Sequence, residues 1–188
     1  MRFDHFGLVA PIYDRVIRSP DLLRLREIAG LELTDRLLDV GGGTGRVSAY
    51  LTSWVASVTI VDASHGMLQQ ATEKGLSTCR GAAERLPFPD GAFDKVVTVD
   101  SFHHFANHEI AASELLRVLA PGGRLTIEEP DIRRFIVKLV ALGESLALMG
   151  SRFRRPDELT RYFQSPETVI DLTATDHTYW LTVDKQRT

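Results

Sequence analysis

Cysteine is nearly absent from this chain. Among 188 residues Cys79 is the only one, which excludes an intramolecular disulfide and favours a reducing compartment. A chain of this length does not need such a cross-link, because it buries roughly 70% of its unfolded surface on folding. We therefore expect one cytoplasmic domain with a core of ordinary size.

Three other features are missing. The net charge is −3, whereas a broad nucleic-acid surface normally gives a strongly basic balance. No apolar run approaches the ~20 residues of a membrane span, because Lys138 and Glu144 interrupt the longest candidate. Residues 1–6 also lack the basic-then-apolar order of a secretory signal. We expect a soluble protein without stable nucleic-acid binding.

Basic residues nevertheless crowd one stretch of the sequence. A solvated helical face explains such a cluster, and a local attraction for an anionic substrate or a lipid surface is the alternative. The residues are Arg133, Arg134, Lys138, Arg152, Arg154, Arg155 and Arg161.

Apolar runs alternate with segments of helical period, which is typical of βαβ units in a mostly parallel sheet. The link 174–177 is too short for a parallel crossover, so the last two strands should form an antiparallel hairpin. The sequence thus predicts an α/β, Rossmann-like, doubly wound sheet of seven strands. Expected strands are 37–40, 57–62, 76–80, 94–99, 124–128, 168–173 and 178–184, and expected helices are 46–53, 64–74, 107–119, 132–149 and 155–163.

A glycine turn follows the first strand. Gly41, Gly43 and Gly45 allow a tight bend and a close approach to a ligand. Asp39 lies two residues before them, and its charge suits a cationic ligand group better than a pyrophosphate. The turn therefore predicts a nucleotide site with a positively charged tail.

Other acids end the neighbouring strands. In an open α/β sheet, ligands bind at the carboxyl ends of the strands, where Asp62, Glu84, Asp100 and Ser101 are expected. Asp62, about twenty residues after the turn, is placed to accept both hydroxyls of a ribose. The alternative is that Asp62 only caps the next helix.

Several nucleotides would fit a ribose acid and a glycine turn. The dinucleotide fingerprint needs a small residue where Arg46 stands, and no Gly-Lys-Ser or Gly-Lys-Thr phosphate loop exists. Asp39 instead suits a nucleoside with an ammonium tail, such as S-adenosylmethionine. A nicotinamide oxidoreductase is retained as a minor alternative.

The chain resembles class I S-adenosylmethionine-dependent methyltransferases in four ordered motifs, within residues 36–130. It is most similar to the ubiquinone and menaquinone biosynthesis C-methyltransferases, and residues 6–14 resemble the amino-terminal segment of that subgroup, whose tyrosine, here Tyr13, helps to close over the cofactor. The four motifs are residues 39–45, 61–68, 83–94 and 117–123.

This resemblance implies roles for individual residues. Asp39 and Gly41 would hold the methionine part of S-adenosylmethionine, and Asp62 the ribose. Ala82 departs from the family, which often has an aspartate there, and losing that hydrogen bond to adenine costs roughly 1 kcal/mol. The full predicted cofactor set is Tyr13, Asp39, Gly41, Gly42, Gly43, Gly45, Asp62, Ala63, Met67, Ala82, Ala83, Glu84, Asp100 and Ser101.

The resemblance also implies a domain layout. Residues 1–188 would form one methyltransferase domain, in which the core binds the cofactor and two helical segments cover it. The expected parts are an N-terminal helical lid at 1–30, the core at 31–131, a helical cap at 132–165 and the hairpin at 166–188.

Methyl transfer relies mainly on alignment of the reactants, which accounts for about 7–11 kcal/mol. A base is needed only when the acceptor must lose a proton, and Asp100, His103 and His104 are our catalytic candidates, with His108 as a further one. Ordinary packing of residues 102–105 is the alternative. No metal site is expected.

The acceptor should be a small, partly apolar molecule, because residues 132–149 are apolar around most of a helix. Packing against the N-terminal segment is the alternative, and Arg133, Arg134 and Lys138 would permit a weak contact with a membrane surface. Quinone precursors, phenols and fatty compounds all fit. The Asn-Pro-Pro-Tyr segment of amino-group methyltransferases is absent at 99–102, which disfavours protein and nucleic-acid acceptors.

A second hypothesis is a non-catalytic S-adenosylmethionine-binding regulatory or partner protein. It is suggested by Ala82 and by the lack of one decisive base. The sequence predicts neither the oligomeric state nor the atom that would be methylated.

Overall fold

The structure is a computed structural model, and it describes residues 7, 10, 14, 21–133, 151–175 and 177–187. Tyr13, most of the predicted lid and nearly all of the predicted helix 132–149 lie outside the described residues.

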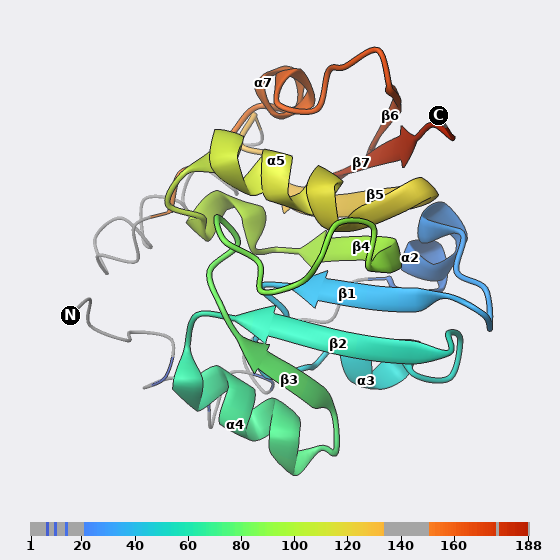
Figure 1. The fold of residues 1–188 in the computed structure, drawn as a ribbon. Helices are drawn as coiled ribbons and strands as arrows, with labels where there is room; N and C mark the ends of the chain where they lie inside the picture. The colour runs from blue at the N-terminus through green and yellow to red at the C-terminus, as the bar shows by residue number, and fades with distance from the viewer. Residues whose placement is uncertain are drawn as a thin grey trace.

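A seven-stranded sheet forms the centre of the molecule (Figure 1). Its strand order is β3-β2-β1-β4-β5-β7-β6. Neighbouring strands among the first five are parallel, and β7 is antiparallel to both β5 and β6. The predicted fold class is confirmed. The strands are β1 (Arg36–Val40), β2 (Ser57–Asp62), β3 (Ser77–Arg80), β4 (Phe93–Val99), β5 (Leu119–Pro130), β6 (Thr168–Ala174) and β7 (Thr178–Lys185).

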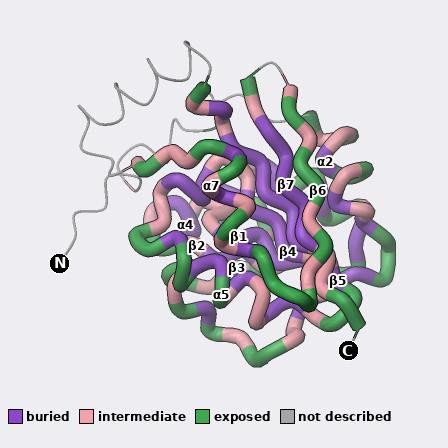
Figure 2. Tube along the Cα trace, turned by 90° about the horizontal axis from the view of Figure 1, so that it is seen from above, coloured by how far each residue is buried: buried purple, intermediate pink, exposed green. Residues whose placement is uncertain are grey.

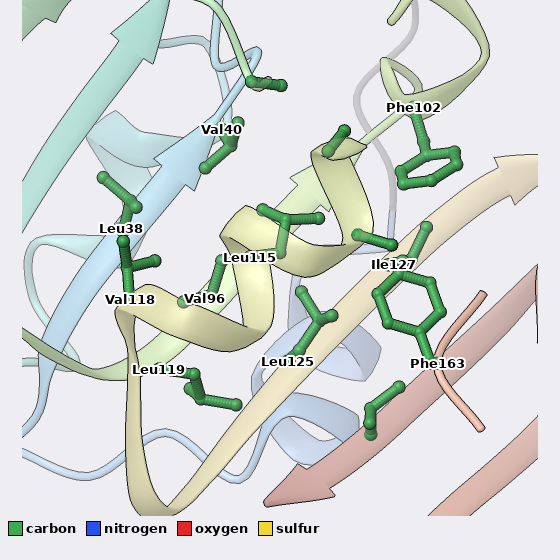
Figure 3. Close-up of a cluster of buried hydrophobic side chains, with 14 of the residues drawn as sticks. Leu38, Val40, Val96, Phe102, Leu115, Val118, Leu119, Leu125, Ile127 and Phe163 are labelled. Carbon is green, nitrogen blue, oxygen red and sulfur yellow. The ribbon is translucent and has the colours of Figure 1, made fainter. Parts of the chain in front are cut away.

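Helices cover both faces of the sheet. Because successive strand residues point to opposite faces, Leu37 packs with α2 and α3 while Leu38 packs with α5 and α7. Figure 3 shows the second of these clusters, with α5 lying over β1, β4 and β5. The helices are α2 (Leu22–Ala29), α3 (Ser48–Leu51), α4 (His65–Glu73), the 3₁₀ turn η1 (Phe102–His104), α5 (His108–Val118) and α7 (Pro156–Arg161).

Burial follows this layering. Figure 2 shows buried residues along the central strands and exposed residues along the connections at the periphery. The site described below lies at one end of these buried strands, so its position is set by the core.

Helix ends match the residues that predicted them. Ser64 accepts from Met67 N at the start of α4, and Gly75, at φ +77°, follows its end. Asn107 accepts from the first-turn amides of α5. Pro156 stands at the first position of α7, where a missing N–H costs nothing. Local capping chemistry therefore located these three helices correctly.

Two boundaries differ from the prediction. The helix predicted at 46–53 shortens to α3, because Tyr50 N donates to Val47 O and Trp54 N to Leu51 O, both i to i−3 bonds that form tight turns. The fifth strand begins at Leu119 rather than at Arg124, since Leu119 pairs with Phe93 before a register shift. Residues 120–123, between the paired positions Leu119 and Arg124, form an irregularity inside β5.

Within the part of the chain that the structure describes, no helix has the length and apolar character needed to cross a bilayer.

Candidate functional site

The predicted site residues lie at the carboxyl ends of β1, β2 and β4. Strand order reverses between β1 and β4, and this switch point is where open α/β sheets bind ligands. Asp39 and the glycine turn come from β1, Asp62 from β2, and Asp100 follows β4. The fold thus brings together segments that are far apart in sequence.

The three glycines of the turn have different surroundings. All have positive φ, +73° at Gly41, +55° at Gly43 and +72° at Gly45. A Cβ on Gly41 would lie 2.6 Å from Ser101 Oγ, and one on Gly45 would lie 2.3 Å from Leu76 Cδ1. A Cβ on Gly43 would meet nothing closer than Met67 Sδ at 3.8 Å. A Cβ would therefore make only ordinary contacts on Gly43, whereas on Gly41 and Gly45 it would clash with neighbouring side chains.

Asp39 is buried beneath the turn. Its Oδ2 accepts from Ser48 Oγ at 2.6 Å and would lie 2.6 Å from a Cβ on Gly42. Burial raises the pKa of Asp39 to about 6, opposed by the Ser48 bond and reinforced by the charge of Asp62. The carboxylate is therefore mostly charged at neutral pH.

Asp62 links the turn to the next helix. Its Oδ2 accepts from Gly43 N at 3.0 Å, and its Oδ1 accepts from Ser64 N at 2.8 Å. The side chain that caps α4 is that of Ser64, so capping is not the main task of Asp62. Each carboxylate oxygen has more than one lone pair, and the predicted ribose role stays a prediction.

The predicted adenine side is built from α4 and the segment after β3. Met67 and Ala83 are buried, and Gly81 N donates to Asp62 O at 3.1 Å. Glu84 Oε1 accepts from Asn107 N at 3.0 Å, which ties this segment to the start of α5. Ala82 forms an isolated bridge with Arg85.

The N-terminal segment reaches the glycine turn through Asp14. Thr44 Oγ1 and Lys74 Nζ both donate to the Asp14 carboxylate, and Lys74 Nζ also donates to Thr44 O at 2.8 Å. Burial opposes ionisation, but the bonds from Lys74 and Thr44 hold the pKa of Asp14 below its usual value. The residue after Tyr13 is thus anchored beside the turn.

Asp100 has an unusual backbone. Its φ of +51° is the only positive value among the described non-glycine residues, and strain of this kind concentrates at functional sites. Asp100 N donates to Glu128 O at 2.9 Å. The adjacent Ser101 is buried, with Oγ 2.6 Å from Thr98 Oγ1 and 3.2 Å from Val40 O. The loop after β4 is therefore held on both neighbouring strands.

Glu129 organises this loop, and the sequence analysis did not identify it. Its Oε1 accepts from Ser101 N at 3.1 Å and from Phe102 N at 2.8 Å. Its Oε2 lies 2.7 Å from His103 Nδ1, with side-chain exposures of 1% and 3% for His103 and Glu129. Beside a carboxylate, His103 Nδ1 carries the proton. The sequence signal that could have identified Glu129 is the pair of adjacent acids, Glu128 and Glu129, at the end of the fifth strand.

The other two histidines, His104 and His108, contact residues 151–154. Burial and the neighbouring His103 lower the pKa of His104 to about 3, and its Nδ1 lies 3.1 Å from Ser151 Oγ. Burial, then Arg154, lowers the pKa of His108, whose Nδ1 accepts from Arg154 Nε at 3.1 Å. A base that holds a proton only near pH 3 is poorly matched to neutral catalysis. Ser151 and Arg154 each form a hydrogen bond with one of these two rings.

Glu128 is the second residue that the sequence analysis missed. Burial, together with the charges of Asp100 and Glu129, raises its pKa to about 8. Its Oε2 has no hydrogen-bond partner among the described residues. Within the same ranges, no group of three or more His, Cys, Asp or Glu is arranged to hold a metal ion.

Residues 38–127 match a family model described as a methyltransferase domain. The chain is 37% identical over 139 residues to a demethylmenaquinone methyltransferase of Thermus thermophilus, covering 66% of this chain and 63% of that protein. It is 32% identical over 151 residues to the ubiquinone/menaquinone biosynthesis C-methyltransferase UbiE of Stutzerimonas stutzeri, covering 72% and 59%. The chain thus spans less than two thirds of either relative.

Solved structures share the fold. The YcgJ protein of Bacillus subtilis has a TM-score of 0.78 at 20% identity, covering 89% of this chain and 98% of that one. The cyclase SpnF has a TM-score of 0.80 at 20% identity, covering 97% and 94%. At this identity the likeness shows the fold alone, because one fold supports different activities.

Proposed function

Because residues 38–127 match a family model described as a methyltransferase domain, we propose that the chain transfers a methyl group from S-adenosylmethionine to a small, partly apolar acceptor. When bound, S-adenosylmethionine supplies an electrophilic methyl group on a sulfonium. The bond from Gly43 N to Asp62 Oδ2 is the observation that carries the proposal, because it fixes a carboxylate beside the open side of the glycine turn.

The residues present fit this cofactor. A Cβ on Gly43 would enter the space beside Met67 Sδ and Asp62 Oδ2, which is the space that a ribose would need. Asp62 would accept the ribose hydroxyls, and Met67 would contact the adenine. Asp39, charged beneath the turn, would attract the ammonium of the methionine part. We also keep Ala63, Ala83, Glu84 and Ser101 in the proposed binding set.

An apolar acceptor is supported by two observations. The relatives named above are called menaquinone and ubiquinone methyltransferases, and residues 132–149 are rich in apolar side chains. The lid and cap of the single-domain layout would cover this acceptor, since Asp14 and residues 151–154 contact the site's loops. A cytoplasmic location belongs to the same proposal and rests on the single cysteine.

Calorimetry with S-adenosylhomocysteine tests the cofactor site. Asp62→Asn should weaken binding about 10- to 100-fold, because a hydrogen bond to a charged group contributes about 1.5–3 kcal/mol. Asp171→Asn on exposed β6 makes the same chemical change away from the site and should leave the affinity unchanged. Equal affinities in both variants would contradict the proposal.

A second candidate is a protein that binds S-adenosylmethionine without methylating anything. The low pKa of His104, caused by its burial, favours this alternative because it removes one predicted base. Transfer of a labelled methyl group to any metabolite would exclude it, whereas tight S-adenosylhomocysteine binding without turnover would support it.

A further inference from the structure

β6 is the outermost strand at one side of the described sheet, and β3 is the outermost strand at the other (Figure 1). A strand edge presents a row of N–H and C=O groups to other chains, and native proteins protect such edges with short strands and with charged residues. β3 has both protections, since it has four residues and ends at Arg80. β6 has seven residues, of which only Asp171 is charged. The edge at β6 is therefore the less protected one.

Apolar side chains of β6 are exposed and border a groove. None of the seven residues is buried, and Val169 is 54% and Leu172 42% exposed. The groove has a volume of about 650 Å³ and lies between β6 and α7, with Ile170 and Leu172 lining it from the strand. A partner at this edge thus needs a strand for the backbone, apolar side chains for the groove and charges that complement α7. The other lining residues are Asp157, Thr160, Arg161 and Gln164.

The backbone of β6 presents alternate residues to a partner. Thr175 N donates to Thr178 O in the turn that joins β6 to β7. Because the direction of the backbone groups alternates along an antiparallel strand, the odd-numbered residues of β6 point their N–H and C=O groups at β7. The outward-pointing groups are therefore those of even-numbered residues, among them Ile170, Leu172 and Ala174.

Two copies of β6 are complementary when they pair in antiparallel about Leu172. In this register Leu172 lies opposite its own copy, Ile170 lies opposite Ala174, and all three exchange backbone hydrogen bonds across the edge. Asp171 lies opposite Thr173, whose hydroxyl donates to a carboxylate. A register centred on Asp171 would instead place like charges directly opposite each other, which is destabilising. A register centred on Ile170 would place an apolar side chain opposite Asp171.

The charges of α7 are complementary in the same arrangement. The two copies of α7 would lie on one face of the continued sheet and run antiparallel, because the two copies of β6 do. Asp157 is at the start of α7 and Arg161 at its end, so the acidic end of each helix faces the basic end of the other. Since α7 contacts β7, three strand spacings would separate the two helices, roughly 14 Å. The long arginine side chain spans most of that gap across the groove.

We propose that the β6 edge and the groove beside α7 bind a second copy of this chain, with β6 pairing to β6 in antiparallel about Leu172. A strand from another protein would meet the same backbone groups, but the charges of α7 and the pairing of Asp171 with Thr173 are matched by a copy. The glycine turn follows β1, which three strands separate from β6. The pairing is therefore independent of the proposed methyltransferase function.

Sedimentation equilibrium of the wild-type chain tests the pairing, and it should show a reversible monomer–dimer equilibrium. Leu172→Lys should weaken the dimer about tenfold or more, because it brings two like charges together at the two-fold axis. Leu33→Lys makes the same change at a residue that is 74% exposed and lies between α2 and β1, and it should leave the dimer unchanged. Both variants should bind S-adenosylhomocysteine as the wild type does, which shows that they are folded.

Two results of this experiment would overturn the proposal. One is a wild-type chain that stays monomeric at millimolar concentration, which would leave the groove to another occupant, such as a peptide strand from a different protein. The other is a dimer that Leu172→Lys weakens no more than Leu33→Lys does. Failure of the wild type to bind S-adenosylhomocysteine would refute the proposed function alone.

Disulfide trapping tests the register. Cα atoms of a hydrogen-bonded antiparallel pair are about 5.5 Å apart, which suits a disulfide. In a Cys79→Ser background, Leu172→Cys should therefore form a covalent dimer under mild oxidation. Val169→Cys is the matched control on the same strand, because its two copies would lie roughly 20 Å apart although Val169 is the more exposed residue. Equal yields from the two variants, or a higher yield from Ile170→Cys, would contradict the pairing about Leu172.

Discussion

The two halves of the site are held in contrasting ways. At the ends of β1 and β2, the two acids bond to partners 2 to 19 residues away: Asp39 to Ser48, and Asp62 to Gly43 and Ser64. At the ends of β4 and β5, Glu129 reaches back 27 and 28 residues to Phe102 and Ser101. Bonds of shorter range hold the acids proposed for the cofactor, and bonds of longer range hold the loop proposed for the acceptor.

Replacement of Glu129, in the β4–β5 half, should cause the largest loss of folding stability. Glu129→Leu leaves His103 Nδ1 and two backbone amides without their buried acceptor, and breaking a buried pair in this way costs about 3–5 kcal/mol. Urea unfolding measures the loss. Glu129→Gln keeps an acceptor oxygen and should lose less, while its affinity for S-adenosylhomocysteine stays within about threefold of the wild type. An unchanged free energy of unfolding in Glu129→Leu would show that this residue does not organise the β4–β5 half.

Asp39 should make stability depend on pH in the β1 half. Its pKa is raised to about 6 in the folded state by burial, so between pH 4 and 6 the folded state binds more protons than the unfolded state, and stability falls as the pH rises through that window. The loss is about 3 kcal/mol, from roughly two units at 1.36 kcal/mol each. Asp39→Asn should flatten the curve in urea titrations at pH 4–7, and an unchanged slope would contradict the buried position.

Gly45 and Gly75 provide a matched pair for the turn. Both have positive φ, +72° and +77°, but a Cβ meets Leu76 Cδ1 at 2.3 Å on Gly45 and nothing within 4 Å on Gly75. Gly75→Ala should cost about 1–2 kcal/mol from backbone strain alone. Gly45→Ala should cost about 1 kcal/mol more, since overpacking adds its own term. Thermal unfolding of both variants makes the comparison, and equal losses would mean that the Leu76 side chain, between α4 and β3, moves aside at no cost in stability.

Gly43→Ala should affect binding more than folding. Its Cβ would make only ordinary contacts, with Met67 Sδ at 3.8 Å and Asp62 Oδ2 at 4.0 Å, so the stability loss should be limited to about 1–2 kcal/mol of backbone strain. The same methyl group would stand in the proposed ribose space and should weaken S-adenosylhomocysteine binding about tenfold, which corresponds to 1.4 kcal/mol. Undiminished affinity by calorimetry would place the ligand elsewhere.

Prediction from sequence succeeded where the determinants are local. The β-branched run of β4 and the Ser64 and Asn107 caps depend on neighbouring residues, so a pattern reveals them. The early start of β5 depends on the pairing of Leu119 with Phe93, which is distant in the chain. No local pattern encodes that pairing.

The acceptor half was harder to predict for the same reason. His104 and His108 attracted attention as bases, but their burial and their contacts with Ser151 and Arg154 come from a segment over 40 residues away. Glu128 and Glu129 differ only in which face of β5 they occupy, and that alternation gives one a neighbour in Trp180 and the other a partner in His103. The register of β5 therefore decides which neighbours each of the two glutamates has.

Calorimetric titration of the wild-type protein with S-adenosylhomocysteine and, separately, with NADH tests the central claim most directly. The account predicts one-to-one binding of S-adenosylhomocysteine and no heat with NADH, because Arg46 occupies the place of the small residue in a dinucleotide fingerprint. Binding of NADH with no response to S-adenosylhomocysteine would contradict it.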